Sequence, residues 1–308
     1  MDTISVVIPT FNRKDNWNDI FLNRSIRSVL KQTHKNIEIV VVIDGLSQCT
    51  KKVIDKIKKE NKDFLGEIKC IETGNKVGGS RARNIGIENS TGEWIALLDD
   101  DDEWVNNKLE KQLMTLKELG SKSKKTFCFT SVLMPEKNQI LPRKNWNNDI
   151  DLCEYLFYTH NGRKQGFIQT STVFAHKELF NSCMFTEGLP QLQDWDWELK
   201  ARYENKFDII QVRTPLSYYY SDGPEKVSQG RRGPYFEKWL KNRKQYFDKK
   251  SYNCFFINIV LKGYVDKSIS KKNNLKLILK LFFANISFKE IDKECLLSFL
   301  KLCIELIG

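Results

Sequence analysis

Residues 37–45 have the sequence IEIVVVIDG, a run of β-branched apolar residues that ends in Asp44 and Gly45. Such a run predicts a strand that is buried on both faces, which is typical of a parallel sheet. The Asp-Gly pair predicts a turn directly after the strand. This segment therefore favours an α/β fold, in which helices cover a parallel sheet.

Predicted strands and helices alternate on both sides of this segment. Apolar runs predict strands, and apolar residues at helical spacing predict helices. The predicted strands are residues 4–9, 67–72, 94–98, 127–133 and 170–174, and the predicted helices are residues 17–32, 50–64, 81–89 and 195–205. The alternation predicts an open, mostly parallel sheet flanked by helices.

Three polar clusters follow predicted strands. They are Pro9–Asn12, Asp44-Gly45 and Asp99–Asp102. Because parallel strands end at the same edge of a sheet, and ligands of such sheets bind beyond that edge, the three clusters predict one site.

Four aspartates, Asp99 to Asp102, come directly after the buried strand at residues 94–98. Adjacent carboxylates raise one another's pKa unless a cation compensates their charge. Mg²⁺ and Mn²⁺ prefer carboxylate and phosphate oxygens, so this acidic quartet is a candidate metal site that leaves positions open for a diphosphate. The alternative is an acidic loop or the N-terminus of a helix, where aspartate is favourable.

Two further segments carry candidate site residues. In Gln193–Trp197 (QDWDW), a carboxylate flanked by large aromatic residues suits a general base, although an N-cap aspartate beside core tryptophans is the alternative. In Gly78–Asn84, paired glycines and arginines before a helix suit contact with a phosphate or a sugar. The three histidines are scattered, and ordinary surface or core roles are expected for them.

Positive charge is concentrated in the C-terminal part of the 308-residue chain. Residues 225–308 contain 18 Lys and Arg against 8 Asp and Glu, and the whole chain has a net charge of +11. Either an anionic partner or a solvated lysine-rich surface is compatible with this charge. In residues 271–283, four lysines interleave with apolar residues, which predicts a basic helix that lies on an anionic membrane or packs on the rest of the protein.

The eight cysteines form no C-x-x-C pair, and the N-terminal residues lack the pattern of a signal peptide. We therefore expect free thiols and a cytoplasmic protein. If the basic helix lies on a membrane, we expect this to be the inner face of the cell membrane. No stretch of 18 uncharged apolar residues predicts a membrane span.

At this point the sequence resembles a known family, the inverting glycosyltransferases of family 2, which have the GT-A fold. The resemblance covers roughly residues 3–215. It rests on five motifs in the family's order and spacing, which are ISVVIPTFNR (4–13), IVVVIDG (39–45), RNIG (83–86), GEWIALLDDDDEW (92–104) and QDWDWEL (193–199).

The resemblance implies a GT-A fold with a mixed, mostly parallel sheet. It implies a catalytic domain at residues 1–224, with a nucleotide-binding half (1–105) and an acceptor half (106–224). The charge and residue pattern of residues 225–308 predict a basic, mainly helical region after this domain. It also implies a hexosyltransferase that moves a hexose or N-acetylhexosamine from a nucleotide sugar, with a UDP-sugar expected. The acceptor would be a saccharide hydroxyl, and a lipid-linked glycan of surface polysaccharide synthesis is expected.

The resemblance also implies roles for single residues. Asp194 would be the catalytic base, Asp101 and Asp99 would ligate Mn²⁺ or Mg²⁺, and Asp44 would bond the nucleotide base. The other expected donor contacts are Pro9, Thr10, Asn12, Arg13, Arg81, Arg83, Asn84 and Asp100, with Arg231 and Arg232 as a lid over the diphosphate. The expected acceptor contacts are Gln169, Trp195 and Asp196.

Two positions depart from the family pattern. Ile43 stands where the family often has a second aspartate before Asp44, and Gln193 replaces a common glutamate. The first change weakens the assignment of base and ribose contacts. A non-catalytic nucleotide-sugar-binding module is the alternative function, and the presence of both the acidic quartet and Asp194 argues against it. A nucleic-acid binder is suggested by charge alone and is not expected.

Overall fold

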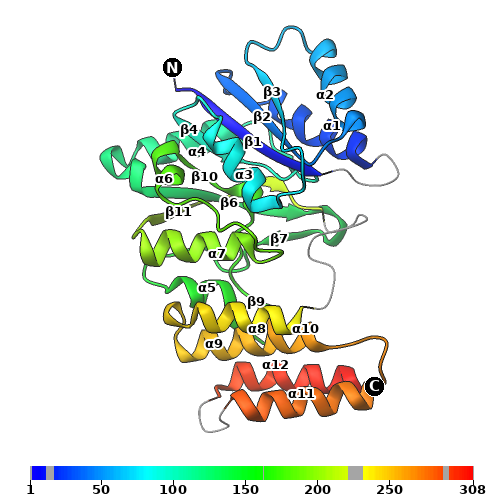
Figure 1. Cartoon of the computed structure of the whole chain (residues 1–308). Coiled ribbons are helices and arrows are strands. Elements are labelled where there is room, and N and C mark those ends of the chain that lie inside the picture. The colour runs from blue at the N-terminus through cyan, green and yellow to red at the C-terminus, as the bar shows by residue number, and fades with distance from the viewer. Residues whose placement is uncertain (1, 12–16, 162, 221–231, 287–290, 308) are drawn as a thin grey trace. The chain divides into compact units, whose positions relative to one another are not determined.

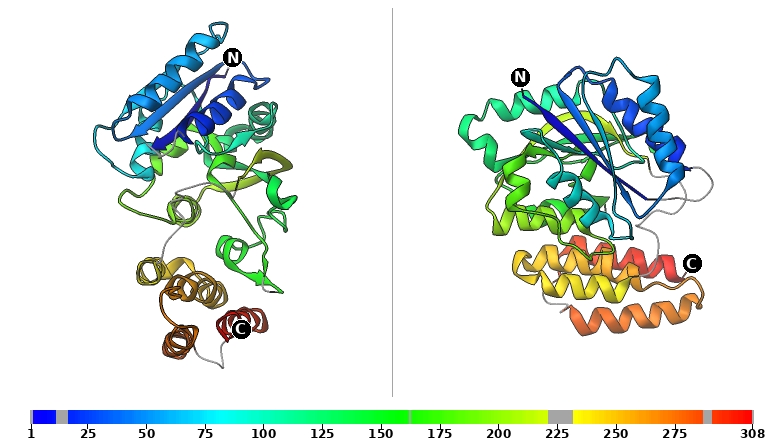
Figure 2. Two further views of the ribbon diagram at one scale, coloured as in Figure 1. Left: turned by 90° about the vertical axis from the view of Figure 1, so that its right-hand side faces the viewer. Right: turned by 45° about the horizontal axis from the view of Figure 1, so that its top comes forward.

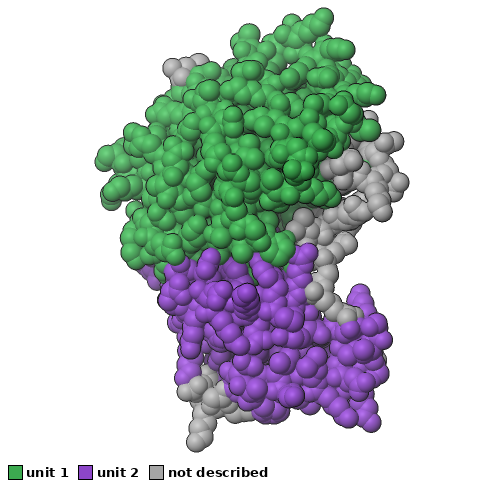
Figure 3. All heavy atoms as spheres, viewed as in Figure 1, with its two compact units in different colours: residues 1–142, 168–225 green, residues 143–167, 226–308 purple. Residues whose placement is uncertain are grey.

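The computed structural model describes residues 2–11, 17–161, 163–220, 232–286 and 291–307 (Figure 1). The chain divides into two compact units, each made of two segments (Figure 3). Unit 1 contains Met1–Pro142 and Ile168–Glu225, and unit 2 contains Arg143–Phe167 and Lys226–Gly308. The segment Arg143–Phe167, which we assigned to the acceptor half, is thus part of unit 2. The functional assignment of the units stays a prediction.

Unit 1 is built on a sheet that has nine strands within the described residues. Their order is β3-β2-β1-β4-β10-β6-β11-β5, with β7 paired to β6. The strands are β1 (Ile4–Phe11), β2 (Ile37–Asp44), β3 (Ile68–Glu72), β4 (Trp94–Leu97), β5 (Glu103–Trp104), β6 (Thr126–Met134), β7 (Gln139–Leu141), β10 (Phe174–His176) and β11 (Asp208–Tyr218). Strands β3, β2, β1 and β4 are parallel, as are β6 and β11, whereas β10, β5 and β7 pair antiparallel. The predicted mixed, mostly parallel sheet is confirmed.

Helices pack on both faces of this sheet (Figures 1 and 2). The helices of unit 1 are α1 (Trp17–Leu30), α2 (Gln48–Glu60), α3 (Gly79–Glu88), α4 (Lys108–Lys117), α6 (Lys177–Ser182) and α7 (Gln193–Leu199). One apolar core joins one face of the strands to α1, α2 and α4, and a second, smaller core joins the other face of β2 to α3. Alternate strand residues supply the two cores because successive side chains point to opposite faces.

The register of the parallel strands brings the predicted clusters to one edge. Phe11 pairs with Asp44, and Val7 pairs with Leu97, two residues before Asp99. The carboxyl ends of β1, β2 and β4 therefore lie together, as expected. The strand predicted at residues 170–174 is wrong, because Thr170–Thr172 forms a 3₁₀ turn and the strand is β10.

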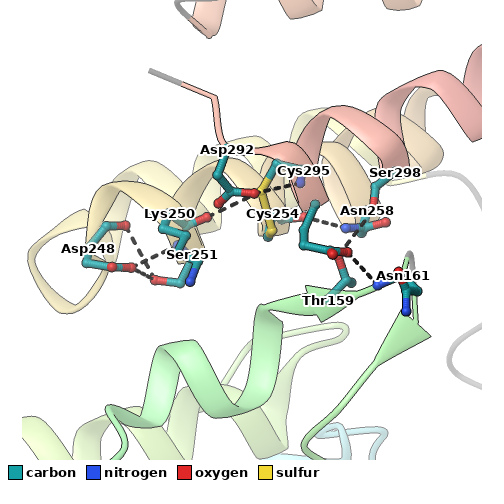
Figure 4. Close-up of a disulfide and its surroundings, with 11 residues drawn as sticks. Thr159, Asn161, Asp248, Lys250, Ser251, Cys254, Asn258, Asp292, Cys295 and Ser298 are labelled. Atoms are coloured by element: carbon teal, nitrogen blue, oxygen red, sulfur yellow. Dashed lines mark hydrogen bonds between the residues drawn. A yellow bond between two sulfur atoms is a disulfide. The ribbon is translucent and has the colours of Figure 1, made fainter. Parts of the chain in front are cut away.

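Unit 2 contains helices and a short hairpin. Its elements are α5 (Leu152–Phe157), β8 (Thr159–His160), β9 (Arg163–Lys164), α8 (Gly233–Asn242), α9 (Lys249–Phe255), α10 (Lys262–Tyr264), α11 (Lys271–Asn285) and α12 (Lys293–Ile307). Thr159 of the hairpin hydrogen-bonds Ser298 of α12 with 3.1 Å between the hydroxyl oxygens (Figure 4). Lys301 Nζ, also of α12, donates to the Asn161 carbonyl at 2.8 Å. These bonds attach α12 to the segment Arg143–Phe167 of the same unit.

Cys254 of α9 and Cys295 of α12 form a disulfide, with their Cα atoms 5.3 Å apart (Figure 4). The expectation of free thiols is therefore wrong for this pair. The two cysteines are 41 residues apart, so no local spacing signals the bond. Disulfides are typical of oxidising compartments, and the cysteines thus no longer favour a cytoplasmic location.

Helix α11 packs against α12, with the rings of Phe282 and Phe299 stacked at 3.6 Å between centroids. Asn274, Ile278 and Phe282 are buried by this packing. For these residues of α11 the structure shows packing within the protein, one of the two alternatives that the sequence left open. None of the helices within the described ranges is long and apolar enough to cross a membrane.

Candidate active site

The acidic quartet follows β4 at the carboxyl edge of the sheet. Asp100 and Asp102 are buried, whereas Asp99 and Asp101 are half-buried. Thr10 Oγ1 donates to Asp100 Oδ2 at 2.5 Å, which ties the end of β1 to the quartet. The hydroxyl of Thr10, a predicted donor contact, is thus engaged with a carboxylate.

Asp102 is 1% exposed and has one satisfied carboxylate oxygen. Its Oδ2 accepts hydrogen bonds from Ser171 Oγ and Gln169 Nε2, both at 2.6 Å. Its buried Oδ1 has no hydrogen-bond partner among the described residues. Burial, followed by the neighbouring Asp101 and Asp99, raises the pKa of Asp102 well above its ordinary value. A carboxyl in this state is stabilised as an anion when a cation lies beside it.

Arg83 of α3 connects the quartet to the beginning of α7. Its Nη2 donates to Asp99 Oδ1 at 2.6 Å, and its Nη1 donates to Gln193 Oε1 at 2.8 Å. Burial opposes the charge of the guanidinium, but Asp99, Asp194 and Asp100 outweigh it and raise the pKa of Arg83. A Cβ at Gly79 would lie 2.8 Å from Gln193 Oε1 and 3.1 Å from Arg83 Nη1, so a larger residue at this position would displace the bridge.

Asp194 lies in the first turn of α7 and is half-buried. Burial raises the pKa of its carboxyl, Arg83 opposes this shift, and the nearby Asp99 adds to it. A carboxylate with a raised pKa accepts a proton more readily than an ordinary aspartate. The fold thus brings the acidic quartet and the segment that contains Asp194 together in one site.

An aromatic cluster holds α7 in place. Trp197 is 1% exposed, stacks on Phe180 and Phe185, and donates from Nε1 to the Cys183 carbonyl at 2.7 Å. Asp196 on the same helix has no exposed surface, which argues against its predicted contact with an acceptor. Trp195 is half-buried, and its acceptor role stays a prediction.

Asp44 at the end of β2 fixes the loop that precedes α3. Its Oδ1 accepts from Val77 N at 2.6 Å, and its Oδ2 accepts from Gly78 N at 3.1 Å. Gly78 has a φ of 85°, a conformation that favours glycine. The predicted bond from Asp44 to a nucleotide base stays a prediction, as does the donor contact of the half-buried Pro9.

Two other predicted donor contacts have partners within the protein. Asn84 is buried and hydrogen-bonds the backbone of Phe185 in both directions, at 3.0 Å and 2.9 Å. Arg81 pairs with Glu88 at 2.9 Å and with Glu187 at 3.3 Å. These contacts give both side chains a structural role, and their contact with a donor stays a prediction.

The remaining predicted residues separate into three groups. Gln169 lies directly before the turn at Thr170–Thr172 and donates to Asp102, and its predicted contact with the acceptor stays a prediction. Arg232 lies in unit 2 directly before α8. The other predicted contacts, Asn12, Arg13 and Arg231, lie outside the described residues.

Sequence reasoning missed three residues of the site. Ser171 bonds Asp102, and Arg24 of α1 donates from Nη2 to the Asp101 carbonyl. Burial and the carboxylates of Asp102, Asp101, Asp99 and Asp194 raise the pKa of Tyr219 to about 12. Residues 218–232 are turn-rich and basic, which does not indicate a site at Tyr219, and nothing in the local sequence indicates Ser171 or Arg24.

Comparison with known proteins identifies the family. The family model described as glycosyl transferase family 2 matches residues 5–132. The amylovoran biosynthesis glycosyltransferase AmsB of Erwinia amylovora is 28% identical over 222 residues, which are 71% of this chain and 69% of AmsB. The comparisons support a family 2 glycosyltransferase. This glycosyltransferase is also similar to WfaP of Escherichia coli, a UDP-Glc:alpha-D-GlcNAc-diphosphoundecaprenol beta-1,3-glucosyltransferase, with 34% identity over 37% of this chain and 41% of WfaP.

Solved structures confirm the GT-A fold of the glycosyltransferase. The S. aureus TarS 1–349 structure with UDP-GlcNAc covers 99% of this chain and 80% of its own, with a TM-score of 0.53 and 15% identity. The mannosyltransferase PcManGT of Pyrobaculum calidifontis, solved with GDP-Man and Mn²⁺, covers 94% of this chain and 77% of its own, with a TM-score of 0.57 and 14% identity. At this level of identity the likeness concerns the fold alone.

Proposed function

We propose that this glycosyltransferase moves a hexose or N-acetylhexosamine from a UDP-sugar to a hydroxyl of a lipid-linked saccharide, with inversion at the anomeric carbon. The supporting observation is the Arg83 bridge, which joins Asp99 of the quartet to Gln193, the neighbour of Asp194. The bridge gives one site both a carboxylate with a raised pKa and a cluster of oxygens suited to a cation. We also propose that catalysis belongs to unit 1, because all these residues lie in it.

In the proposed reaction Asp194 acts as the general base. The acceptor oxygen attacks the anomeric carbon while its proton passes to the Asp194 carboxylate. The bond from that carbon to the diphosphate oxygen breaks, and the nucleoside diphosphate leaves with the electron pair. Because one displacement inverts the centre, an α-linked donor gives a β-linked product. Arg83 joins Asp99 to Gln193, the neighbour of Asp194, and balances the charge of both carboxylates.

A divalent cation fits the quartet chemically. The described residues contain no group of three or more His, Cys, Asp or Glu side chains arranged to hold a metal. Mg²⁺ and Mn²⁺ need fewer protein ligands when a substrate diphosphate supplies oxygens, and the buried, unsatisfied Asp102 Oδ1 is such a ligand. We propose that Asp101 and Asp99 hold the cation, and that Asp102 lies beside them with its unpaired Oδ1 close to the positive charge. When bound, it would neutralise charge on the leaving diphosphate.

The choice of donor and acceptor rests on the relatives. WfaP is named for a UDP-glucose donor and a diphosphoundecaprenol acceptor. A Campylobacter jejuni relative, 34% identical over 35% of this chain, is named as a GalNAc(5)-diNAcBac-PP-undecaprenol beta-1,3-glucosyltransferase. We therefore propose a polyprenyl-diphosphate-linked saccharide as the acceptor class and surface polysaccharide synthesis as the process.

Contact with a membrane surface follows from this acceptor, and we assign it to α12. Leu300, Ile304 and Ile307 are 47%, 66% and 71% exposed and follow one another at helical spacing. Phe283 of α11 is also exposed, and lysines of both helices are exposed. Apolar residues that insert between lipids, together with lysines that attract anionic headgroups, suit peripheral binding to an anionic membrane surface.

A donor screen tests the reaction. We expect the protein to release UDP from one of UDP-Glc, UDP-Gal, UDP-GlcNAc and UDP-GalNAc when Mn²⁺ or Mg²⁺ and a synthetic polyprenyl-diphosphate saccharide are present. Chelation of the metal should abolish release, and added metal should restore it. UDP release that ignores the chelator would contradict the metal assignment, and GDP release alone would contradict the UDP assignment.

A further inference from the structure

A lysine side chain lies inside the core of unit 1, beside the site. Lys108, the first residue of α4, is 0% exposed. Its Nζ donates to Gln112 Oε1 at 2.6 Å and lies 3.9 Å from the centroid of the Trp104 ring. Lysine is almost never fully buried unless it is paired, because removal of the ammonium from water is costly. We therefore expect the buried cation at this position to have a functional role.

Both partners of Lys108 hold neighbouring carbonyls of the same turn. Trp104 Nε1 donates to the Ser171 carbonyl at 2.7 Å, and Gln112 Nε2 donates to the Thr172 carbonyl at 2.8 Å. The protonated amine of Lys108 can only donate, and in this form it faces the oxygen of the Gln112 amide. The amide nitrogen is then directed at the turn. An apolar residue at position 108 would not select this orientation.

The same turn contacts the acidic quartet from its other side. Ser171 Oγ donates to Asp102 Oδ2 at 2.6 Å and accepts from Asp99 N at 2.9 Å. Gln169, which precedes the turn, donates to the same Asp102 oxygen. A displacement of this turn would therefore move or rotate the carboxylates of Asp99 and Asp102.

We propose that Lys108 is a positioning residue for sugar transfer. Through Trp104 and Gln112 it fixes the turn at Thr170–Thr172, and through Ser171 that turn orients the quartet. The assignment rests on the proposed function, because it assumes that the quartet binds a metal and a diphosphate. It explains why a costly buried cation stands where an apolar residue would pack.

The test replaces Lys108 by methionine, which keeps the length of the side chain and removes its charge. We expect Lys108→Met to lower kcat at saturating donor by about tenfold or more, because small displacements of catalytic groups are costly. The rise in thermal midpoint on addition of UDP and Mn²⁺ should shrink, while the midpoint without ligands should not fall. Lys111→Met, on the same helix, is the matched control and should behave as wild type.

Two results would overturn the assignment. One is a Lys108→Met protein with wild-type kcat and a wild-type response to UDP and Mn²⁺. The other is a parallel loss of activity and of ligand-free stability, which indicates a merely structural role. If the methionine variant does not fold, Trp104→Phe tests the second support of the turn, with the same expected loss. A wild-type protein that does not respond to UDP and Mn²⁺ would instead contradict the proposed function.

Discussion

The buried ammonium of Lys108 predicts an unusual dependence of stability on pH. Burial lowers its pKa from 10.5 to about 7. A shift of this size corresponds to roughly 5 kcal/mol in favour of the neutral form in the folded protein. Between pH 7 and 10.5 the unfolded chain binds more protons at this residue than the folded protein does, so stability rises with pH in that window. Below pH 7 the full penalty is present.

The measurement is the free energy of unfolding of wild type and Lys108→Met at pH 7, 8 and 9. The difference removes titrations that the two proteins share. We expect wild type to gain about 2 kcal/mol relative to the variant between pH 7 and 9, as proton linkage predicts for these two pKa values. Cys128, the titratable group of β6 next to Lys108, does not interfere because burial raises its pKa to about 12.

A matched comparison keeps this test specific. The difference between wild type and Lys111→Met should not change over the same pH range. If the difference for Lys108→Met were equally flat, Lys108 would titrate as an ordinary solvated lysine. This result would refute the argument that burial of the Lys108 ammonium is costly, and with it the inference that Lys108 has a positioning role.

Three further predictions concern other parts of the molecule. Gly86→Ala should destabilise unit 1 by about 1–3 kcal/mol in chemical denaturation, the usual cost of overpacking. The new Cβ would lie 2.3 Å from Val7 Cγ1. A neutral effect would contradict the packing of α3 on β1. Arg83→Met should lower kcat/KM at least tenfold, through loss of the bridge, and unchanged kinetics would remove Arg83 from the site. Replacement of Cys254 and Cys295 by serine should destabilise unit 2 by about 2–4 kcal/mol under oxidising conditions, and no difference from wild type under those conditions would contradict the disulfide.

The membrane assignment has a direct test as well. We expect the protein to float with vesicles that contain anionic phospholipid and not with neutral vesicles at the same lipid concentration. Ile304→Glu should weaken flotation, because a carboxylate on the exposed face of α12 opposes both insertion and charge attraction. Glu305→Gln is the matched control and should bind at least as well as wild type. Equal flotation of the Ile304 variant would exclude this face.

The sequence predicted those strands whose conformation follows from the local pattern of apolar residues. Apolar β-branched runs predicted β1, β2 and β4, and parallel pairing then determined which of their ends meet. The turn at Thr170–Thr172 was predicted as part of a strand because residues 170–174 (TSTVF) are rich in β-branched residues, which are typical of strands. Its actual shape depends on long-range bonds from Trp104 and Gln112. Such long-range bonds cannot be predicted from the composition of the segment.

The candidate site shows the same division. The quartet and Asp194 stand out in the sequence because carboxylates beside a buried strand or among aromatic residues are unusual. Ser171 and Arg24 do not stand out, since their contacts with the quartet join residues more than 60 positions apart. Asn84 was predicted to contact the donor because it lies next to Arg83 in a family motif. Its hydrogen bonds to Phe185 became visible only in the fold.

Substitution of Asp194 by asparagine examines the proposed chemistry most directly, since the amide preserves shape and cannot take up a proton. With the donor that the screen identifies, transfer by Asp194→Asn should fall about 100- to 10,000-fold, the usual contribution of a general base. Calorimetric affinity for UDP with Mn²⁺ should remain close to that of wild type, and the wild-type product should have the inverted anomeric configuration. A variant that transfers sugar at the wild-type rate, or a wild-type product with retained configuration, would contradict the account.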